Sequence, residues 1–284
     1  MIYLDVINFP SDYSHVYPYT IPAIKDLGSI SFSPITIFAG SNGSGKSTII
    51  NAIAEKLSKF FPTQKSLGNT GGYFKWFSEH CTCNYDARMR HTFPASCRLI
   101  KSEDIMDGII TQRKSNEKIE MQSNILKRKA LSDYDDEEQF DIGKRDEELS
   151  DSQRFYRSLV HGYGEAKILE NTIQAECSNG ESAINYFSQS LLADDSLFLL
   201  DEPENSLAPK LQVELIQLIQ GFARFYKCQF IIATHSPFLL SLKGAKIYDL
   251  DKFPVKAKNW HELDNMRAYA KLFFENEKFF NISS

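Results

Sequence analysis

The chain has 284 residues, of which 42% are hydrophobic, and its formal net charge is −5. This length suits one large domain or two small ones, and the composition is ordinary for a protein with a packed core. No apolar run approaches the roughly 20 residues of a membrane-spanning helix, and the first residues lack a secretory signal pattern. We therefore expect a cytoplasmic protein that does not cross a membrane. Its five cysteines, an odd number, argue against a disulfide framework.

The N-terminal part alternates short β-like runs with turn residues. We predict strands at Ile2–Asn8, Ser29–Ser33 and Ile35–Ala39, the last leading into a Gly-rich segment. A helix is predicted from Lys46 to about Lys59, because apolar residues recur there at helical spacing.

The Gly-rich segment, Gly40–Thr48, fits the pattern G-x-x-x-x-G-K-[ST] and is here called the phosphate loop. Its glycines permit a tight turn whose N–H groups point at phosphate oxygens, and the helix that follows adds its positive end. We expect Lys46 to reach the β- and γ-phosphates of ATP and Ser47 to bind Mg²⁺. The predicted nucleotide-binding residues are Gly40, Ser41, Asn42, Gly43, Ser44, Gly45, Lys46, Ser47 and Thr48.

The middle of the chain, from about Ser102 to Arg157, is polar and heavily charged. Part of it suits a helix, around Asn116–Leu131, and residues 132–152 are predicted to form a mobile surface loop. Its basic cluster, Lys127–Lys129, is interpreted first as a solvated face, with contact to nucleic-acid phosphates as the alternative.

Two continuous apolar runs, Leu197–Leu200 and Phe230–Ala233, have the length of strands buried on both faces. A stretch of helical periodicity lies between them, so the order strand–helix–strand predicts an α/β core. We expect Asp201 after the first run to hold Mg²⁺ and Glu202 to orient the attacking water. After the second run comes Thr234–Pro237, here called the switch loop, whose His235 is expected to contact the γ-phosphate or that water.

A fourth motif, Cys177–Ser182, precedes a helix-compatible stretch at Ser182–Leu192. Small polar residues before a helix can build an anion site. The segment Ser178, Asn179, Gly180 and Glu181 is here called the signature segment and is predicted to bind nucleotide.

These motifs, in this order, resemble an ABC-type ATPase domain of the SMC, RecF and OLD-like branch. The resemblance is closest to small standalone bacterial AAA ATPases and to the ATPase subunits of defence systems such as PtuA. It implies a single P-loop NTPase domain over 1–284, with a mixed sheet flanked by helices and a helical lobe inserted at about 75–175. It also implies a D-loop near Asn205–Leu207.

The resemblance further implies a head-to-head homodimer in which ATP bound by one copy is covered by the signature segment of the other. The predicted function is Mg²⁺-dependent ATP hydrolysis coupled to DNA repair or antiviral defence through a partner effector, a nuclease or toxin. The alternative is a nucleotide-gated regulatory module with little turnover. Whether the protein contacts nucleic acid stays open. ABC domains also carry a Gln that links Mg²⁺ to the helical lobe, and its position here stays open between Gln112 and the segment Lys101–Glu103.

Three further patterns leave alternatives open. The aromatic that stacks on adenine has three candidates, Tyr13, Tyr17 and Tyr19. Residue types that can bind zinc stand at His80, Cys81, Cys83, His91 and Cys97. Their spacing is not that of a usual zinc site, so reduced, partly buried thiols are favoured over metal binding. The aromatic residues Phe273, Phe274, Phe279 and Phe280 are expected to pack on the core, with a partner-docking face as the alternative.

Overall fold

The computed structural model describes residues 1–10, 20–25, 27–60, 63–64, 79–85, 94–131, 179–191 and 194–279. The chain forms two compact units, one of Met1–Met106 with Asn179–Ser284 and the other of Asp107–Ser178. The expected mobile loop at 132–152 lies outside the described residues, and the lobe boundaries at about 75–175 stay a prediction. The candidate site belongs to the first unit.

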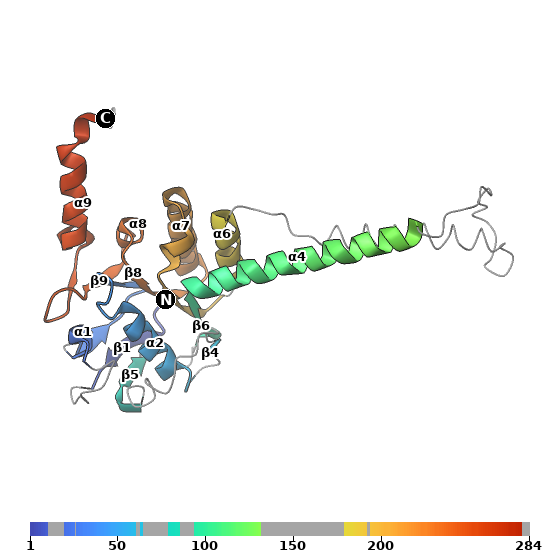
Figure 1. The fold of residues 1–284 in the computed structure, drawn as a ribbon. Helices are drawn as coiled ribbons and strands as arrows, with labels where there is room; N and C mark the ends of the chain where they lie inside the picture. The colour runs from blue at the N-terminus through green and yellow to red at the C-terminus, as the bar shows by residue number, and fades with distance from the viewer. Residues whose placement is uncertain are drawn as a thin grey trace, which may run out of the picture. The chain divides into compact units, whose positions relative to one another are not determined.

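The first unit is built around a mixed seven-stranded sheet (Figure 1). Its order is β10 (Lys256–Lys258), β9 (Lys246–Asp249), β3 (Ile35–Ala39), β8 (Gln229–Thr234), β7 (Ser196–Asp201), β6 (Ser96–Lys101) and β4 (Thr63–Gln64). All neighbours pair in parallel except β9 and β10. Parallel strands bring their carboxyl ends to one edge of the sheet, so the residues that follow β3, β7 and β8 meet there.

A second, antiparallel sheet has the order β2 (Ser29–Ser31), β1 (Leu4–Asn8) and β5 (Thr82–Tyr85). The α-helices are α1 (Pro22–Lys25), α2 (Lys46–Leu57), α4 (Ser102–Leu131), α6 (Asn179–Ser190), α7 (Pro209–Phe225), α8 (Pro237–Leu240) and α9 (Asp264–Glu275). Three short 3-10 helices are η3 (Pro203–Ser206), η4 (Trp260–Glu262) and η5 (Glu277–Phe279).

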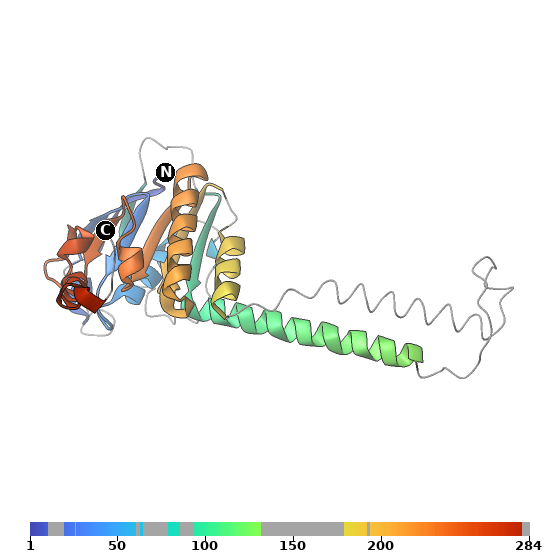
Figure 2. The ribbon, with the colours of Figure 1, turned by 90° about the horizontal axis from the view of Figure 1, so that it is seen from above.

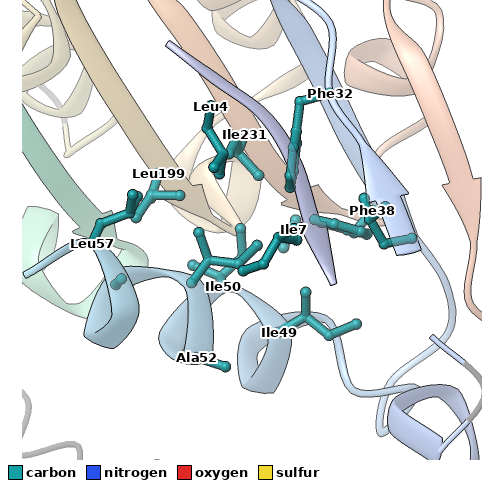
Figure 3. Close-up of a cluster of buried hydrophobic side chains, with 14 of the residues drawn as sticks. Leu4, Ile7, Phe32, Phe38, Ile49, Ile50, Ala52, Leu57, Leu199 and Ile231 are labelled. Carbon is teal, nitrogen blue, oxygen red and sulfur yellow. The ribbon is translucent and has the colours of Figure 1, made fainter. Parts of the chain in front are cut away.

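Helices cover both faces of the large sheet. Helix α2 contacts β7 and β8 on one face, and α6 and α7 lie side by side on the other (Figures 1 and 2). The core beneath α2 joins this helix to both sheets (Figure 3). There Ile50 of α2 is fully buried among Ile7 of β1 and Leu199 of β7. This packing fixes where α2 begins, and therefore where the phosphate loop lies.

The predicted fold class is confirmed as α/β, with a mixed central sheet flanked by helices. The expected start of one helix needs correction. Helix α4 begins at Ser102, well before the expected Asn116, and Ile105 and Ile109 in its first turns are buried. None of the described helices is long and apolar enough to cross a membrane.

The expectation that the aromatic residues near the C-terminus pack on the core is wrong for the three that the structure describes. Phe273, Phe274 and Phe279 are 53%, 79% and 72% exposed, and Phe280 lies outside the described residues. Helix α9 buries Met266 near its start, and every residue from Arg267 to Glu275 is exposed. Phe273 and Phe274 lie in α9 and Phe279 lies in η5, and the sequence pattern alone does not say what covers these residues.

Candidate functional site

The phosphate loop connects β3 to α2 as predicted. Gly43 and Gly45 have φ angles of 81° and 99°, in the left-handed region that side chains disfavour. Helix α2 starts at Lys46, directly after this turn. The loop therefore has the backbone turn and the adjoining helix N-terminus that suit phosphate binding.

Lys46 is only 3% exposed and its ammonium lies inside the loop. It donates to the carbonyls of Gly40 and Ser41, both at 3.0 Å, and lies 3.4 Å from Glu202 Oε1. A pocket of about 430 Å³ opens beside it, lined by Ile21, by the loop residues Asn42, Gly43 and Gly45–Thr48, and by Glu202. This volume falls within the usual range for small-molecule sites.

Asp201 ends strand β7 beside the start of α2. The Ser47 hydroxyl donates to Asp201 Oδ1 at 2.9 Å, so the two predicted Mg²⁺ ligands, 154 residues apart in sequence, are in contact. Burial raises the pKa of Asp201 to about 6, against the lowering effect of the Ser47 hydrogen bond, and the nearby Glu202 carboxylate raises it further.

Glu202 follows with a φ of 48°, which is unusual for a residue with a side chain. Its backbone N–H donates to the Ala233 carbonyl at 2.9 Å, which ties the end of β7 to β8. Burial would raise the pKa of Glu202, but a hydrogen bond from Asn205 and the ammonium of Lys46 outweigh it and leave the pKa lowered. Glu202 is therefore a carboxylate at neutral pH.

His235 reaches the same edge from the loop after β8. Its Nδ1 lies 3.7 Å from Glu202 Oε1 and 3.5 Å from Glu204 Oε1, and its side chain is 43% exposed. The structure thus brings together Lys46, Ser47, Asp201, Glu202 and His235, as the motifs predict.

Sequence reasoning missed Glu204, which organises the switch loop. Its buried carboxylate accepts hydrogen bonds from the Thr234 hydroxyl (2.5 Å) and from the backbone N–H groups of His235 (3.0 Å) and Ser236 (3.2 Å). The residue stands within the quoted motif DEPEN, but its partners are about 30 residues away, so no local pattern reveals them.

Two more residues connect these loops. Gln212 of α7 donates to the Leu207 carbonyl at 2.8 Å and accepts from the Ser236 hydroxyl, so it joins the expected D-loop to the switch loop. Asp251, just after β9, binds Ser41 of the phosphate loop. An acid at the carboxyl end of a parallel strand was the signal used for Asp201, and the same signal could have found Asp251.

Other predicted site residues fall partly or wholly outside the described part of the chain. Ser178 lies outside it, while Asn179, Gly180 and Glu181 form the first turn of α6, with undescribed side chains. The candidates Tyr13, Tyr17 and Tyr19, and His91 of the zinc-type pattern, also lie outside it, and the side chain of Gln112 is undescribed.

The cysteines gather no metal site in the described ranges, where no three His, Cys, Asp or Glu side chains form a cluster that could hold an ion. Burial raises the pKa of Cys81 to about 12 and that of Cys83 to about 11. These thiols therefore stay protonated at neutral pH.

The residues present suit ATP with Mg²⁺. Ser47 and Asp201 place a hydroxyl and a carboxylate oxygen in contact, and oxygen ligands are those Mg²⁺ prefers. Ser44 Oγ is buried in the loop with no hydrogen-bond partner among the described residues, so its hydroxyl is available as a donor.

Several known proteins are similar to this chain. Residues 112–241 match the family described as "AAA domain, putative AbiEii toxin, Type IV TA system". The chain is 24% identical over 230 residues to the ABC transporter ATP-binding protein YtrE of Bacillus subtilis (strain 168), a match that covers 80% of this chain and 84% of YtrE.

Two solved structures are also similar. One is the Smc head domain of Pyrococcus furiosus bound to the C-terminal domain of ScpA, which is 12% identical and has a TM-score of 0.43. The match covers 96% of this chain and all of that chain. The other is an ATP-binding cassette of an ABC transporter in its ADP conformation, which is 14% identical and has a TM-score of 0.45. The match covers 96% of this chain and 99% of that chain. The expected resemblance to ABC-type ATPase domains is confirmed.

Proposed function

We propose that this chain binds ATP with Mg²⁺ and hydrolyses it to ADP and phosphate. The observation that carries the proposal is the meeting of two distant segments at one pocket. Lys46 and Ser47 of the phosphate loop contact Glu202 and Asp201 at the end of β7. A buried cation for phosphate, a pair of oxygen ligands and an ionised carboxylate are the parts that this reaction needs.

Each side chain has a distinct part in this proposal. The loop N–H groups and Lys46 bind the phosphates, while Ser47 and Asp201 hold Mg²⁺, which when bound would neutralise charge on the phosphate oxygens. Glu202, with its lowered pKa, accepts a hydrogen bond from the attacking water and orients it. His235, half-exposed beside Glu202, contacts that water or the γ-phosphate.

The active form is proposed to be a homodimer with shared sites. The signature segment of one copy would cover ATP held by the phosphate loop of the other, with Ser178, Gly180 and Glu181 acting across the interface. Support comes from the N-terminus of α6, where Asn179 and Gly180 stand at the positive end of a 12-residue helix. Nucleotide would then stabilise the closed dimer, because only that state supplies both sets of phosphate donors.

We propose that closure is coupled to DNA repair or anti-phage defence through a separate nuclease or toxin. The family description, with its AbiEii toxin and Type IV TA system, supports a defence role. If ATP is bound with little turnover, the same site would gate the effector as a regulatory module instead. Turnover measured with and without the effector distinguishes these two outputs.

Two substitutions test the proposed hydrolysis. Lys46→Ala should weaken ATP binding by roughly 10- to 100-fold, since a hydrogen bond to a charged group contributes about 1.5–3 kcal/mol. Glu202→Gln should keep ATP binding but slow turnover by roughly 10²- to 10⁴-fold, the usual contribution of general base catalysis. The second variant should also accumulate as an ATP-bound dimer. Calorimetry, phosphate release and light scattering measure these three quantities.

Matched controls remove the same charges elsewhere. Lys243→Ala and Glu277→Gln change exposed residues outside the pocket, so both should bind and hydrolyse ATP like the unmodified protein. Full turnover by Glu202→Gln would refute the assignment of the attacking water to Glu202. Binding of ATP by the unmodified protein without measurable turnover, alone or with its effector, would favour the regulatory module.

A further inference from the structure

A second pocket adjoins the phosphate pocket. It measures about 230 Å³ and shares Ile21, Asn42 and Gly43 with its larger neighbour. Its other walls include Pro22 at the start of α1 and Phe253 in the turn after β9. A ligand whose phosphates lie in the larger pocket therefore has room to place its remaining part in this one.

The turn after β9 is fastened directly to the phosphate loop. The Asp251 carboxylate accepts from the backbone N–H of Ser41 at 3.0 and 2.9 Å and from its hydroxyl at 2.8 Å. One residue earlier, the N–H of Leu250 donates to the Ala39 carbonyl at 2.8 Å, which continues the pairing of β9 with β3. Phe253 follows two residues after Asp251, so its position is set relative to the phosphate loop.

The side chains of this pocket suit a flat aromatic ligand. The Phe253 ring is 47% exposed at the pocket wall and can accept a contact there, whereas Leu250 beneath the turn is 1% exposed. Ile21 and Pro22 add aliphatic surface. Every nucleobase has a π-face, and stacking on an aromatic side chain stabilises it without selecting strongly among bases.

We propose that Phe253 is the stacking platform for the base of the bound nucleoside triphosphate, with Asp251 as the positioning residue that holds the turn in place. The inference rests on the proposed nucleotide binding and assigns the part of the ligand beyond its phosphates. The resemblance expects the stacking residue upstream of the phosphate loop, at Tyr13, Tyr17 or Tyr19. Here a residue more than 200 positions downstream takes this place.

The test compares a ligand that has a base with one that does not. Equilibrium binding of Mg·ATP and of magnesium tripolyphosphate is measured by calorimetry for the unmodified protein, Phe253→Ala, Phe253→Leu and Phe253→Trp. Phe253→Ala should bind ATP roughly 10- to 100-fold more weakly, the effect of losing one stacked base. Its affinity for tripolyphosphate should stay within about twofold, because the phosphate contacts are untouched.

The other variants separate stacking from folding. Phe253→Leu keeps apolar bulk without a π-face and should also lose ATP affinity, whereas Phe253→Trp should keep it. Phe225→Ala, which removes an equally large ring that is 71% exposed at the end of α7, should leave both affinities unchanged. Thermal melting of each variant confirms that it is folded.

Several outcomes would overturn the inference. Unchanged ATP affinity in Phe253→Ala would do so, above all if Tyr13→Ala, Tyr17→Ala or Tyr19→Ala lost it. Equal loss of ATP and tripolyphosphate would mean that the turn shapes the phosphate loop and does not stack on a base. An unmodified protein that binds tripolyphosphate as tightly as ATP would exclude a base subsite but keep the phosphate site. If it binds neither ligand, the proposed function itself fails.

Discussion

Burial of the Asp201 carboxylate serves its proposed role as a Mg²⁺ ligand and does not stabilise the folded protein at neutral pH. Its raised pKa, caused mainly by burial, means that the folded protein holds a proton on this group more tightly than the unfolded chain does. The resulting contribution to the free energy of unfolding is present at low pH and is lost as the pH rises from the ordinary value of 3.8 through about 6. Above that pH the nucleotide-free protein carries a buried charge with a net cost.

Asp201→Asn should therefore stabilise the nucleotide-free protein at pH 8 while abolishing Mg²⁺-dependent hydrolysis. The amide oxygen can still accept from Ser47, and the gain is on the order of 3 kcal/mol, since the pKa rises from 3.8 to about 6 and one pKa unit corresponds to about 1.4 kcal/mol. Thermal melting without nucleotide should show a rise of a few degrees at pH 8 and less at pH 5.

Asp249 provides the matched control for that substitution. It is also a buried Asp at the end of a core strand, but Lys258 lies 2.7 Å away. Asp249→Asn should destabilise the protein, because it leaves a partly buried ammonium without its carboxylate. A lower melting temperature for Asp201→Asn at pH 8 would contradict the cost assigned to the buried charge.

At the scale of elements, Glu204 connects η3 to the switch loop. Its carboxylate satisfies three donors of the loop after β8, and the backbone N–H of Glu202 bonds to β8 itself. Movement of the loop that carries His235 is thereby coupled to the turn that carries Glu202. Gln212 extends the coupling to Leu207 of the expected D-loop.

Glu204→Ala should lower kcat by roughly 10- to 100-fold, because Glu204 positions His235. The Kd for ATP should change less than about threefold, because Glu204 is not among the residues that line the phosphate pocket. It should also destabilise the protein by about 1–3 kcal/mol, the cost of unsatisfied buried donors. Glu204→Gln keeps an acceptor oxygen and should restore most of kcat. Equal losses in kcat and ATP affinity would mean that Glu204 only maintains the fold.

The same elements show what the sequence could and could not predict. Ile35–Ala39 was predicted with its observed bounds, and the apolar runs of β7 and β8 were found to within a residue or two, because strands buried on both faces are continuous apolar runs. Strand β5 was missed because its stability depends on pairing with β1, some 75 residues away. The roles of Glu204 and Phe253 were missed for the same reason, since their contacts exist only after the chain folds.

For the whole molecule, the decisive question is whether each site is shared between two copies. If it is, one copy can lack a working phosphate loop and the other a working signature segment, and a mixed dimer still has one complete site. Lys46→Ala damages the phosphate loop. Gly180→Asp damages the signature segment, because it places a negative charge beside the γ-phosphate. The helix itself tolerates this change, because an acid in the first turn of α6 is favourable.

Each variant alone should be inactive, and an equal mixture should recover about a quarter of the unmodified rate. Random pairing makes about half of the dimers mixed, and each mixed dimer has one of its two sites complete. Phosphate release from the mixture against protein concentration measures this recovery, which should vanish on dilution as dimers separate. Gly180→Ala, which keeps the backbone donor and adds no charge, should stay active by itself. If the mixture is as inactive as its components, the signature segment does not act across a dimer interface, and the site must be completed within one chain.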